Sequence, residues 1–85
     1  MNFFSSMFSP NIGKLERDRD FTKLIKCLGS KNRNLREKAQ EALARTGEPA
    51  VDYLINALAE EDENVTTFAS RAMQLMNELA VPRLI

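Results

Sequence analysis

The side chains best suited to chemistry in this 85-residue chain are a single cysteine and a run of four carboxylates. Cys27 could act as a nucleophile only if a neighbouring base lowered its pKa, and the chain contains no histidine for that role. The carboxylates at positions 60–63 have the charge to attract a divalent cation, but further oxygen ligands do not occur at suitable spacings. Zinc-ligand spacings and glycine-rich phosphate loops are missing as well. The sequence therefore predicts a protein that is not an enzyme and that holds no cofactor and no metal.

Both features also have a simpler structural interpretation. Cys27 matches Ala57 at an offset of 30 residues, so we expect it to serve as a small apolar side chain in a helix. The acidic run is expected to form a solvated turn in which Asp62 caps the helix that follows. Neither interpretation requires a ligand.

Six lysines and arginines fall within residues 23–38 and could contact the phosphates of a nucleic acid. They are Lys23, Lys26, Lys31, Arg33, Arg36 and Lys38. Against this interpretation, Glu37 and Glu41 interrupt the basic surface, and aromatic residues that stack on single strands are missing from it. The isoelectric point is also mildly acidic, unlike that of most nucleic-acid-binding domains. Nucleic-acid binding is therefore an alternative to protein binding rather than the first hypothesis.

Charge is unevenly divided along the chain, although the net charge is zero. Residues 1–45 carry ten lysines and arginines and five acidic residues, whereas residues 46–85 carry two and seven. Such polarity affects how a protein associates and orients rather than how it folds. A solvated surface with an accidental asymmetry is the alternative interpretation.

The elements that would carry these side chains are helices, and residues 32–58 predict a helical hairpin. Asn32 caps the first helix, Gly47 ends it with a left-handed backbone, and Pro49 opens the second. Apolar residues at helical spacing form a stripe on each helix, and the short connection predicts that the two stripes pack antiparallel. The stripes are Leu35, Ala39, Ala42 and Leu43 in the first helix and Val51, Leu54, Ile55 and Leu58 in the second.

The same apolar positions recur at an offset of 30 residues on both sides of this hairpin. Phe21, Leu24, Ile25 and Leu28 match the second stripe, and Val65, Ala69, Ala72 and Met73 match the first. A fixed period in this range is typical of a solenoid, in which each unit buries its open face against a neighbour. We therefore expect an all-α fold, an α-solenoid of antiparallel helical hairpins in a right-handed stack.

The repeat divides a single domain, residues 1–85, into four parts. They are an apolar N-terminal segment (1–9), a partial repeat (10–28), a full repeat (32–59) and a truncated repeat (62–85). Helices are expected near residues 10–17, 20–28, 33–46, 49–59 and 63–77, followed by a short C-terminal helix. Ser9, with Pro10 after it, and Asp20 are the expected caps of the first two helices. Asn77 is expected to end the last long helix, as Gly47 ends its counterpart.

The repeat resembles a known family, the short HEAT-like repeats first associated with phycobilisome lyases and abundant in small archaeal and bacterial proteins. The likeness covers residues 20–85, and the stretch that carries it is residues 24–65, LIKCLGSKNRNLREKAQEALARTGEPAVDYLINALAEEDENV. Repeats of this family begin their first helix with D-x-x-V-R, and the arginine can pair with acids of neighbouring units. Asn32, Leu35 and Arg36 fill those positions here, but Thr66 replaces the arginine in the next repeat.

The resemblance implies a scaffold that binds other proteins, because this family consists mostly of scaffolds. One subgroup resembles bilin lyases, so a chromophore-handling lyase is a further alternative. The absence of histidine, and hence of any Cys/His pair, argues against that alternative.

The resemblance also predicts where a partner binds, since the second helices of such solenoids line the concave face. The residues of these helices that do not point into the core are Lys23, Lys26, Asp52, Tyr53 and Asn56. At the offset of 30, Lys23, Tyr53 and Arg83 form one row, and Lys26 and Asn56 form another. Because tyrosine and arginine are favoured at binding hot spots, we expect a protein partner at the row around Tyr53. A generic hydrated helix surface is the alternative.

Both ends of the chain are apolar. Phe3, Phe4, Met7 and Phe8 could cap the open core, mediate self-association or, with less support, contact a membrane surface; Val81, Leu84 and Ile85 lie at the other end. Apolar ends of opposite charge predict weak head-to-tail self-association that strengthens as salt is lowered. No apolar run is long enough to cross a bilayer and no basic residues open a secretory signal, so a cytoplasmic location is expected.

The basic cluster generates the first testable prediction. We expect negligible binding to duplex or single-stranded oligonucleotides at physiological salt, measured by fluorescence anisotropy. If the cluster does bind phosphates, affinity should fall with salt by about one power per contact. Micromolar binding that disappears in the double variant Arg33→Glu with Arg36→Glu would contradict the protein-binding hypothesis.

Overall fold

The backbone of residues 11–80, the part of the chain that the computed structural model describes, forms helices and contains no strand. In chain order the elements are α2 (Ile12–Arg17), α3 (Phe21–Cys27), α4 (Arg33–Thr46), the 3-10 turn η1 (Glu48–Ala50), α5 (Val51–Ala57) and α6 (Glu63–Ala80). The all-α class is therefore confirmed for these residues. The predicted segments before residue 11 and after residue 80 lie outside the described residues.

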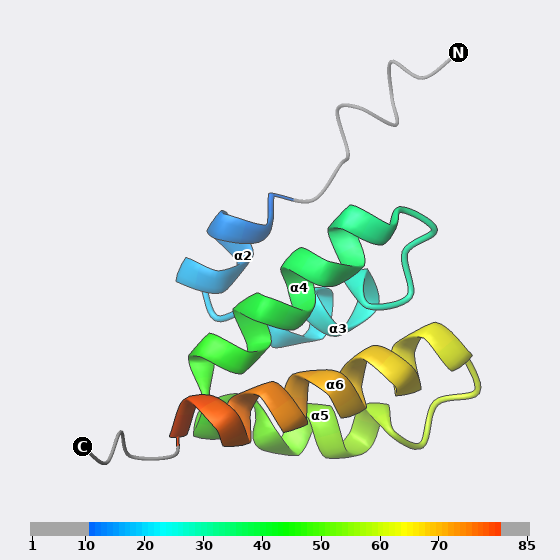
Figure 1. Cartoon of the computed structure of the whole chain (residues 1–85). Helices are drawn as coiled ribbons and strands as arrows, with labels where there is room; N and C mark the ends of the chain where they lie inside the picture. The colour runs from blue at the N-terminus through cyan, green and yellow to red at the C-terminus, as the bar shows by residue number, and fades with distance from the viewer. Residues whose placement is uncertain (1–10, 81–85) are drawn as a thin grey trace.

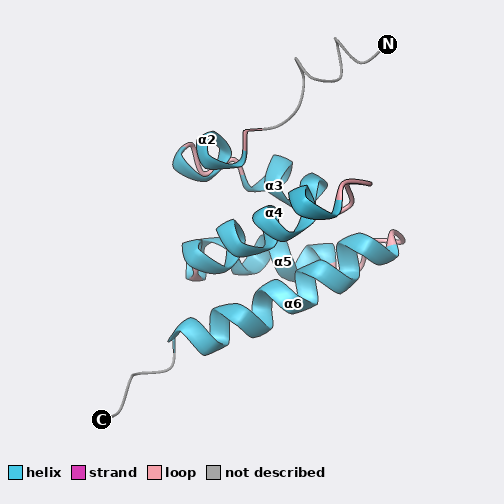
Figure 2. Ribbon diagram, turned by 45° about the horizontal axis from the view of Figure 1, so that its top comes forward, coloured by secondary structure: helices cyan, strands magenta, loops and turns pink. Residues whose placement is uncertain are grey.

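The helices follow one another through the molecule in chain order. Figure 2 shows α2 and α3 at one end, α4 and α5 in the middle, and α6 at the other end. α4 packs against α2, α3 and α6, and α5 packs against α3 and α6. In Figure 1, α4 and α6 lie side by side, and α5 lies next to α6. The central position therefore belongs to α4.

Short polar side chains begin the helices as expected, with one difference. The side chain of Asp20 accepts a hydrogen bond from the backbone N–H of Lys23 at 3.2 Å, and that of Asn32 accepts one from Leu35 at 3.2 Å. These two predicted caps are confirmed. The predicted cap at Ser9 lies outside the described residues. α2 begins at Ile12, later than predicted, and Asn11 caps it by accepting a hydrogen bond from the backbone N–H of Lys14 at 3.1 Å.

Gly47 ends α4 with a positive φ, as the sequence predicts. Its φ is 78° and its ψ is −138°, so it lies outside the left-handed helical basin, in a region that side-chain-bearing residues rarely occupy. The chain then makes the 3-10 turn η1, which contains Pro49, before α5 begins at Val51. The second helix of the hairpin is therefore shorter than predicted, because its first turn is tighter than an α-helix.

The turn between α2 and α3 passes through a second positive φ, at Arg19 (57°). Nothing in the residue type predicts this, because arginine has no preference for the left-handed region. Backbone hydrogen bonds hold the turn: the Arg19 N–H donates to the Glu16 carbonyl at 3.2 Å, and the Asp20 N–H donates to the Leu15 carbonyl at 2.9 Å. The compact turn brings α2 back against α3.

α6 continues past the point where the repeat predicts its end. Asn77 was expected to match Gly47 and to stop the helix, but α6 runs to Ala80. The prediction is wrong because asparagine only tolerates the left-handed region, whereas Glu78, Leu79 and Ala80 are good helix formers. A glycine at this position would have been a much stronger stop signal.

Leucines and alanines make up much of the core, together with Ile12, Phe21, Cys27, Val65 and Phe68. Four leucines are fully buried: Leu24, Leu28, Leu43 and Leu54. Five alanines have no exposed surface: Ala39, Ala42, Ala50, Ala69 and Ala72. Since an alanine adds only a methyl group to the backbone, buried alanines let packed helices approach closely. The predicted burial of Leu43 and Leu54, one from each stripe of the hairpin, is confirmed.

Two members of the predicted second stripe are not buried. Ile55 is 49% exposed and Leu58 is 44% exposed, although both were expected to pack against the first helix. Their counterpart Leu28 is 0% exposed because α5 and α6 pack against α3. α3 packs against α2, α4, α5 and α6, whereas the main contacts of α5 among the described residues are with α3, α6 and η1, so α5 is less completely covered.

Adjacent residues of α5 provide a matched stability test. Leu54→Ala should lower the free energy of unfolding by about 2–5 kcal/mol, because it removes a fully buried side chain and leaves a cavity. Ile55→Ala should lower it by less than about 1 kcal/mol, because half of that side chain already lies in solvent. Urea denaturation followed by circular dichroism measures both. Equal losses of unfolding free energy in the two variants would show that Leu54 is no more deeply buried than Ile55.

Candidate interaction groove

A groove of about 390 Å³ lies between α3 and α5. Ile25 and Lys26 of α3 form one wall, and Tyr53 and Asn56 of α5 form the other. The remaining lining residues come from these helices, from the turns that follow them and from the region where α6 begins: Thr22, Gly29, Ala57, Glu60, Asp62 and Val65. The groove is open to solvent and mixes apolar walls with a few polar groups, as binding sites commonly do.

The structure brings together three of the six residues predicted to meet a partner. Lys26, Tyr53 and Asn56 line the groove, and all three are exposed. Lys23 and Asp52 are exposed but do not line it. Lys23 instead lies 3.7 Å from Asp20 in an ion pair one helical turn away. Arg83 lies outside the described residues, as do the N-terminal phenylalanines.

Tyr53 is held in place by a buried neighbour on the other helix. The ring centroids of Tyr53 and Phe21 are 5.2 Å apart and the rings are tilted by 58°. This arrangement is favourable for aromatic pairs, since the edge of one ring meets the face of the other. Phe21 is 7% exposed and Tyr53 is 43% exposed, so the buried ring anchors the accessible one. A fixed aromatic side chain loses little conformational entropy when a partner binds.

Gly29 allows α6 to begin close to α3 at the end of the groove. A Cβ at this position would lie 2.9 Å from Cγ2 of Val65 and 3.0 Å from Oδ2 of Asp62, closer than carbon atoms normally approach. The carboxylate of Asp62 also caps α6, accepting hydrogen bonds from the backbone N–H groups of Asn64 (2.8 Å) and Val65 (3.4 Å). Asp62 is therefore the predicted cap and also part of the groove. Sequence reasoning missed the importance of Gly29. The residue 30 positions later is Ala59, so the offset gives no indication that this position requires glycine.

Charges of both signs border the groove. Lys26 belongs to one wall and Glu60 to the other, and Lys26 takes part in none of the ion pairs found among residues 11–80. Its ammonium group is thus available to an acidic group of a partner. Glu60 offers the opposite charge a short distance along the chain from Asn56.

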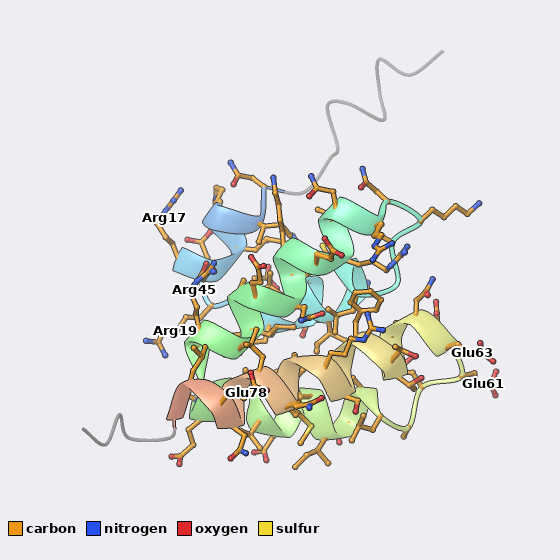
Figure 3. All side chains as sticks on the ribbon, in the orientation of Figure 1. Arg17, Arg19, Arg45, Glu61, Glu63 and Glu78 are labelled. Atoms are coloured by element: carbon orange, nitrogen blue, oxygen red, sulfur yellow. The ribbon has the colours of Figure 1, made fainter. Side chains whose placement is uncertain are left out.

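Cys27 is buried, with 5% of its surface exposed, and burial raises the pKa of its thiol. A thiol with a raised pKa is poorly ionised at neutral pH and is a weak nucleophile. Of the acidic run, Asp62 caps α6, and Figure 3 shows Glu61 and Glu63 projecting outward near the turn before α6. Residues 11–80 contain no group of three or more histidine, cysteine or carboxylate side chains placed to hold a metal ion. The absence of enzymatic activity stays a prediction.

The basic cluster is less available than its composition indicates. Nη1 of Arg36 donates to the backbone carbonyl of Ser30 at 2.6 Å, and its guanidinium lies 5.2 Å from the ring centroid of Phe68. Arg33 is paired with Glu37 at 3.1 Å on the same helix. For the oligonucleotide test, the double variant Arg33→Glu with Lys38→Glu is therefore preferable to Arg33→Glu with Arg36→Glu. Lys38 is exposed, so its replacement disturbs no packing contact of this kind.

Arg36 also departs from what the family resemblance implies. In the family, the arginine at this position can pair with an acid of a neighbouring unit. Arg36 forms no ion pair among the described residues. Arg36 contacts α6 instead, through the face of Phe68, an attractive cation–π arrangement. Arg71 approaches the same ring at 5.0 Å, so Phe68 contacts two guanidinium groups.

Comparison of the chain with family models, with curated proteins and with solved structures finds no match. The likeness to HEAT-like repeats therefore stays a prediction from the residues. Within residues 11–80, none of the helices has the length and hydropathy needed to traverse a lipid bilayer.

The close approach at Gly29 can be tested with a matched pair of glycine variants. Gly29→Ala should lower the free energy of unfolding by about 1–3 kcal/mol, because the new methyl group pushes Asp62 and Val65 away. Gly13→Ala should raise it by about 0.5–1 kcal/mol, since Gly13 lies within α2 and the nearest atoms that a Cβ would meet, Oδ1 of Asn11 and Nη1 of Arg17, are 3.5 and 3.7 Å away. Thermal and urea denaturation measure both. Stabilisation by Gly29→Ala would show that α6 does not begin against α3.

Proposed function

We propose that the protein is a non-catalytic protein-interaction module whose partner binds in the groove between α3 and α5. The observation that carries the proposal is the presence of Tyr53 beside Lys26 and Asn56 in that groove, with its ring anchored on Phe21. Tyrosine contributes strongly at interfaces because it combines apolar area with a directional hydroxyl group. The neighbouring amide and ammonium groups add directional hydrogen bonds.

We further propose that the helices form a short HEAT-like α-solenoid with a right-handed stack, whose second helices α3 and α5 line the partner-binding face. The repeated burial supports this. Leu24 and Leu54 are both fully buried, and Cys27 and Ala57 are both at most 5% exposed. The packing of α5 against α3 supports it as well, since neighbouring second helices adjoin one another in such a stack.

The size and chemistry of the groove favour a short polypeptide segment as the bound part of the partner. A volume of about 390 Å³ accommodates a few side chains rather than an extended surface. An aromatic or aliphatic side chain would pack against Ile25 and Tyr53, and a carboxylate beside it would meet Lys26. Binding of this size is weak or transient unless further contacts outside the groove add to it.

A comparison of variants tests this function. Asn56→Arg should block the groove without disturbing the core, because Asn56 is exposed and lines one wall. Immobilised wild-type protein should retain a partner from native lysate that the Asn56→Arg variant loses by at least about tenfold, a change of about 1.4 kcal/mol in binding free energy. Quantitative mass spectrometry of the retained proteins measures the ratio.

Two further variants make the result specific. Gln74→Arg adds the same charge at an exposed position of α6 outside the groove, and should retain the partner at the wild-type level. Tyr53→Ala should lose the partner as Asn56→Arg does, with circular dichroism to confirm that the helices remain intact. If no protein is lost selectively from the groove variants, the groove is not the binding site.

A further inference from the structure

A strip of three apolar side chains lies on α5 and on the residue that ends it, away from the groove: Val51, Ile55 and the C-cap residue Leu58, here called the α5 strip. Their spacing of i, i+4 and i+7 places them on one side of the helix. Ile55 follows Tyr53 by two residues, which is about 200° around the helix axis, so the strip faces away from α3. Ile55 is 49% exposed and Leu58 is 44% exposed, whereas most large apolar side chains of the described residues are covered.

The chain itself shows how such a strip is covered. The matching positions of α3, 30 residues earlier, are Phe21, Ile25 and Leu28. Phe21 and Leu28 are 7% and 0% exposed, whereas Ile25 is half-buried and lines the groove. Phe21 and Leu28 are covered because α5 and α6 pack against α3, and the ring of Tyr53 packs on Phe21. The strip is thus covered at two of its three positions on α3, and among the described residues it is more open on α5.

The surroundings of the open strip are strongly acidic. Residues 46–80 contain seven carboxylates: Glu48, Asp52, Glu60, Glu61, Asp62, Glu63 and Glu78. Arg71 is the one basic residue in that range, and its guanidinium lies 5.0 Å from the ring centroid of Phe68. Glu48 and Asp52 adjoin the start of the strip, and the acidic run 60–63 follows its end. A partner with basic flanks would be attracted to this surface.

We propose that the α5 strip binds a basic amphipathic helix of a partner protein, laid beside α5 as α5 lies beside α3. Apolar side chains of that helix cover Ile55 and Leu58, and its lysines or arginines meet the surrounding carboxylates. This is helix recognition through a stripe of apolar positions, with charge setting orientation. None of the three strip residues lines the groove, although Glu60 and Asp62 of the acidic run do. The inference does not rest on the function proposed above.

A second copy of the chain fits the strip less well. In the described residues, the exposed large apolar side chains are Tyr53, Ile55, Leu58 and Leu79, and all of them lie on α5 or α6. Two copies that paired through these residues would bring their acidic segments together, which is unfavourable. The basic helices α2 and α3 of a second copy offer none of these exposed apolar side chains in return.

The test uses the chain's own covering helix as a template. A peptide with the sequence of residues 48–60 is stapled into a helix, because a free peptide of this length is barely helical. One version carries Glu48→Lys, Asp52→Lys and Glu60→Lys, and the other keeps the native acids. By fluorescence anisotropy with the full chain, the lysine peptide should bind at least about tenfold more tightly than the acidic one, and its affinity should fall as salt is raised.

Protein variants locate the site. Ile55→Ser with Leu58→Ser should weaken binding of the lysine peptide by at least about tenfold, because the apolar contact is lost. Gln74→Ser, at an exposed position of α6, is the matched control and should bind as the wild type does. Circular dichroism confirms that each variant is folded.

Four results would overturn the proposal, and the first three concern the peptides. They are failure of the lysine peptide to bind, equal affinity for the two peptides, and undiminished binding by the double variant. A fourth is self-association in sedimentation equilibrium that the double variant abolishes, since the occupant of the strip would then be a second copy. None of these results bears on the groove variants, so the two proposals fail separately.

Discussion

The rest of the structure depends on the close approach of α4 and α6. The two helices pack against each other, and each carries two alanines with no exposed surface, Ala39 and Ala42 on α4 and Ala69 and Ala72 on α6. A larger side chain at any of these positions would push neighbouring elements apart, because a close-packed interior has no space to absorb even a methylene group. Since α4 also packs against α2 and α3, an error at this contact would spread through the described fold.

The candidate groove is a consequence of that contact. Because α6 is held against both α4 and α5, its first turn is brought to the end of the groove, where Asp62 and Val65 meet the bare backbone of Gly29. The polar groups of the groove are thus positioned by helices rather than by long loops. Side chains placed in this way are oriented before a partner arrives, which reduces the entropy lost on binding.

Sequence reasoning succeeded where the physical cause is local or periodic. The caps at Asp20 and Asn32 each depend on a side chain and a backbone N–H three residues further on. Glycine is nearly the only residue type suited to the backbone angles at position 47. Helical spacing correctly predicted that Leu24, Leu43 and Leu54 are buried. The offset of 30 paired Lys26 with Asn56, and both line the groove, but it paired Tyr53 with Lys23, which does not.

Sequence reasoning failed where the position of a residue depends on a neighbouring element, or on the absence of one. Leu58 stands 30 positions after the fully buried Leu28, yet it is 44% exposed because fewer of the described elements pack around α5 than around α3. Arg36 was expected to find an acid, but Phe68 is what α6 presents to it. Gly29 has an ordinary turn composition, and its importance depends on atoms more than 30 positions away.

The one ion pair that joins distant elements of the described chain is that of Arg45, at the end of α4, with Glu16 of α2, where two hydrogen bonds of 2.7 and 3.1 Å form. The hydrogen bonds from Arg45 hold the pKa of the Glu16 carboxyl below its usual range. A carboxyl with a lowered folded-state pKa stabilises the fold above its unfolded-state pKa, and this contribution is lost as pH falls through the folded-state value. The contact of Arg36 with Phe68 has no titrating carboxylate. Acid therefore weakens the attachment of α2 while leaving that contact between α4 and α6 unchanged, so the molecule should open from its α2 end, as a local unfolding unit rather than as a whole.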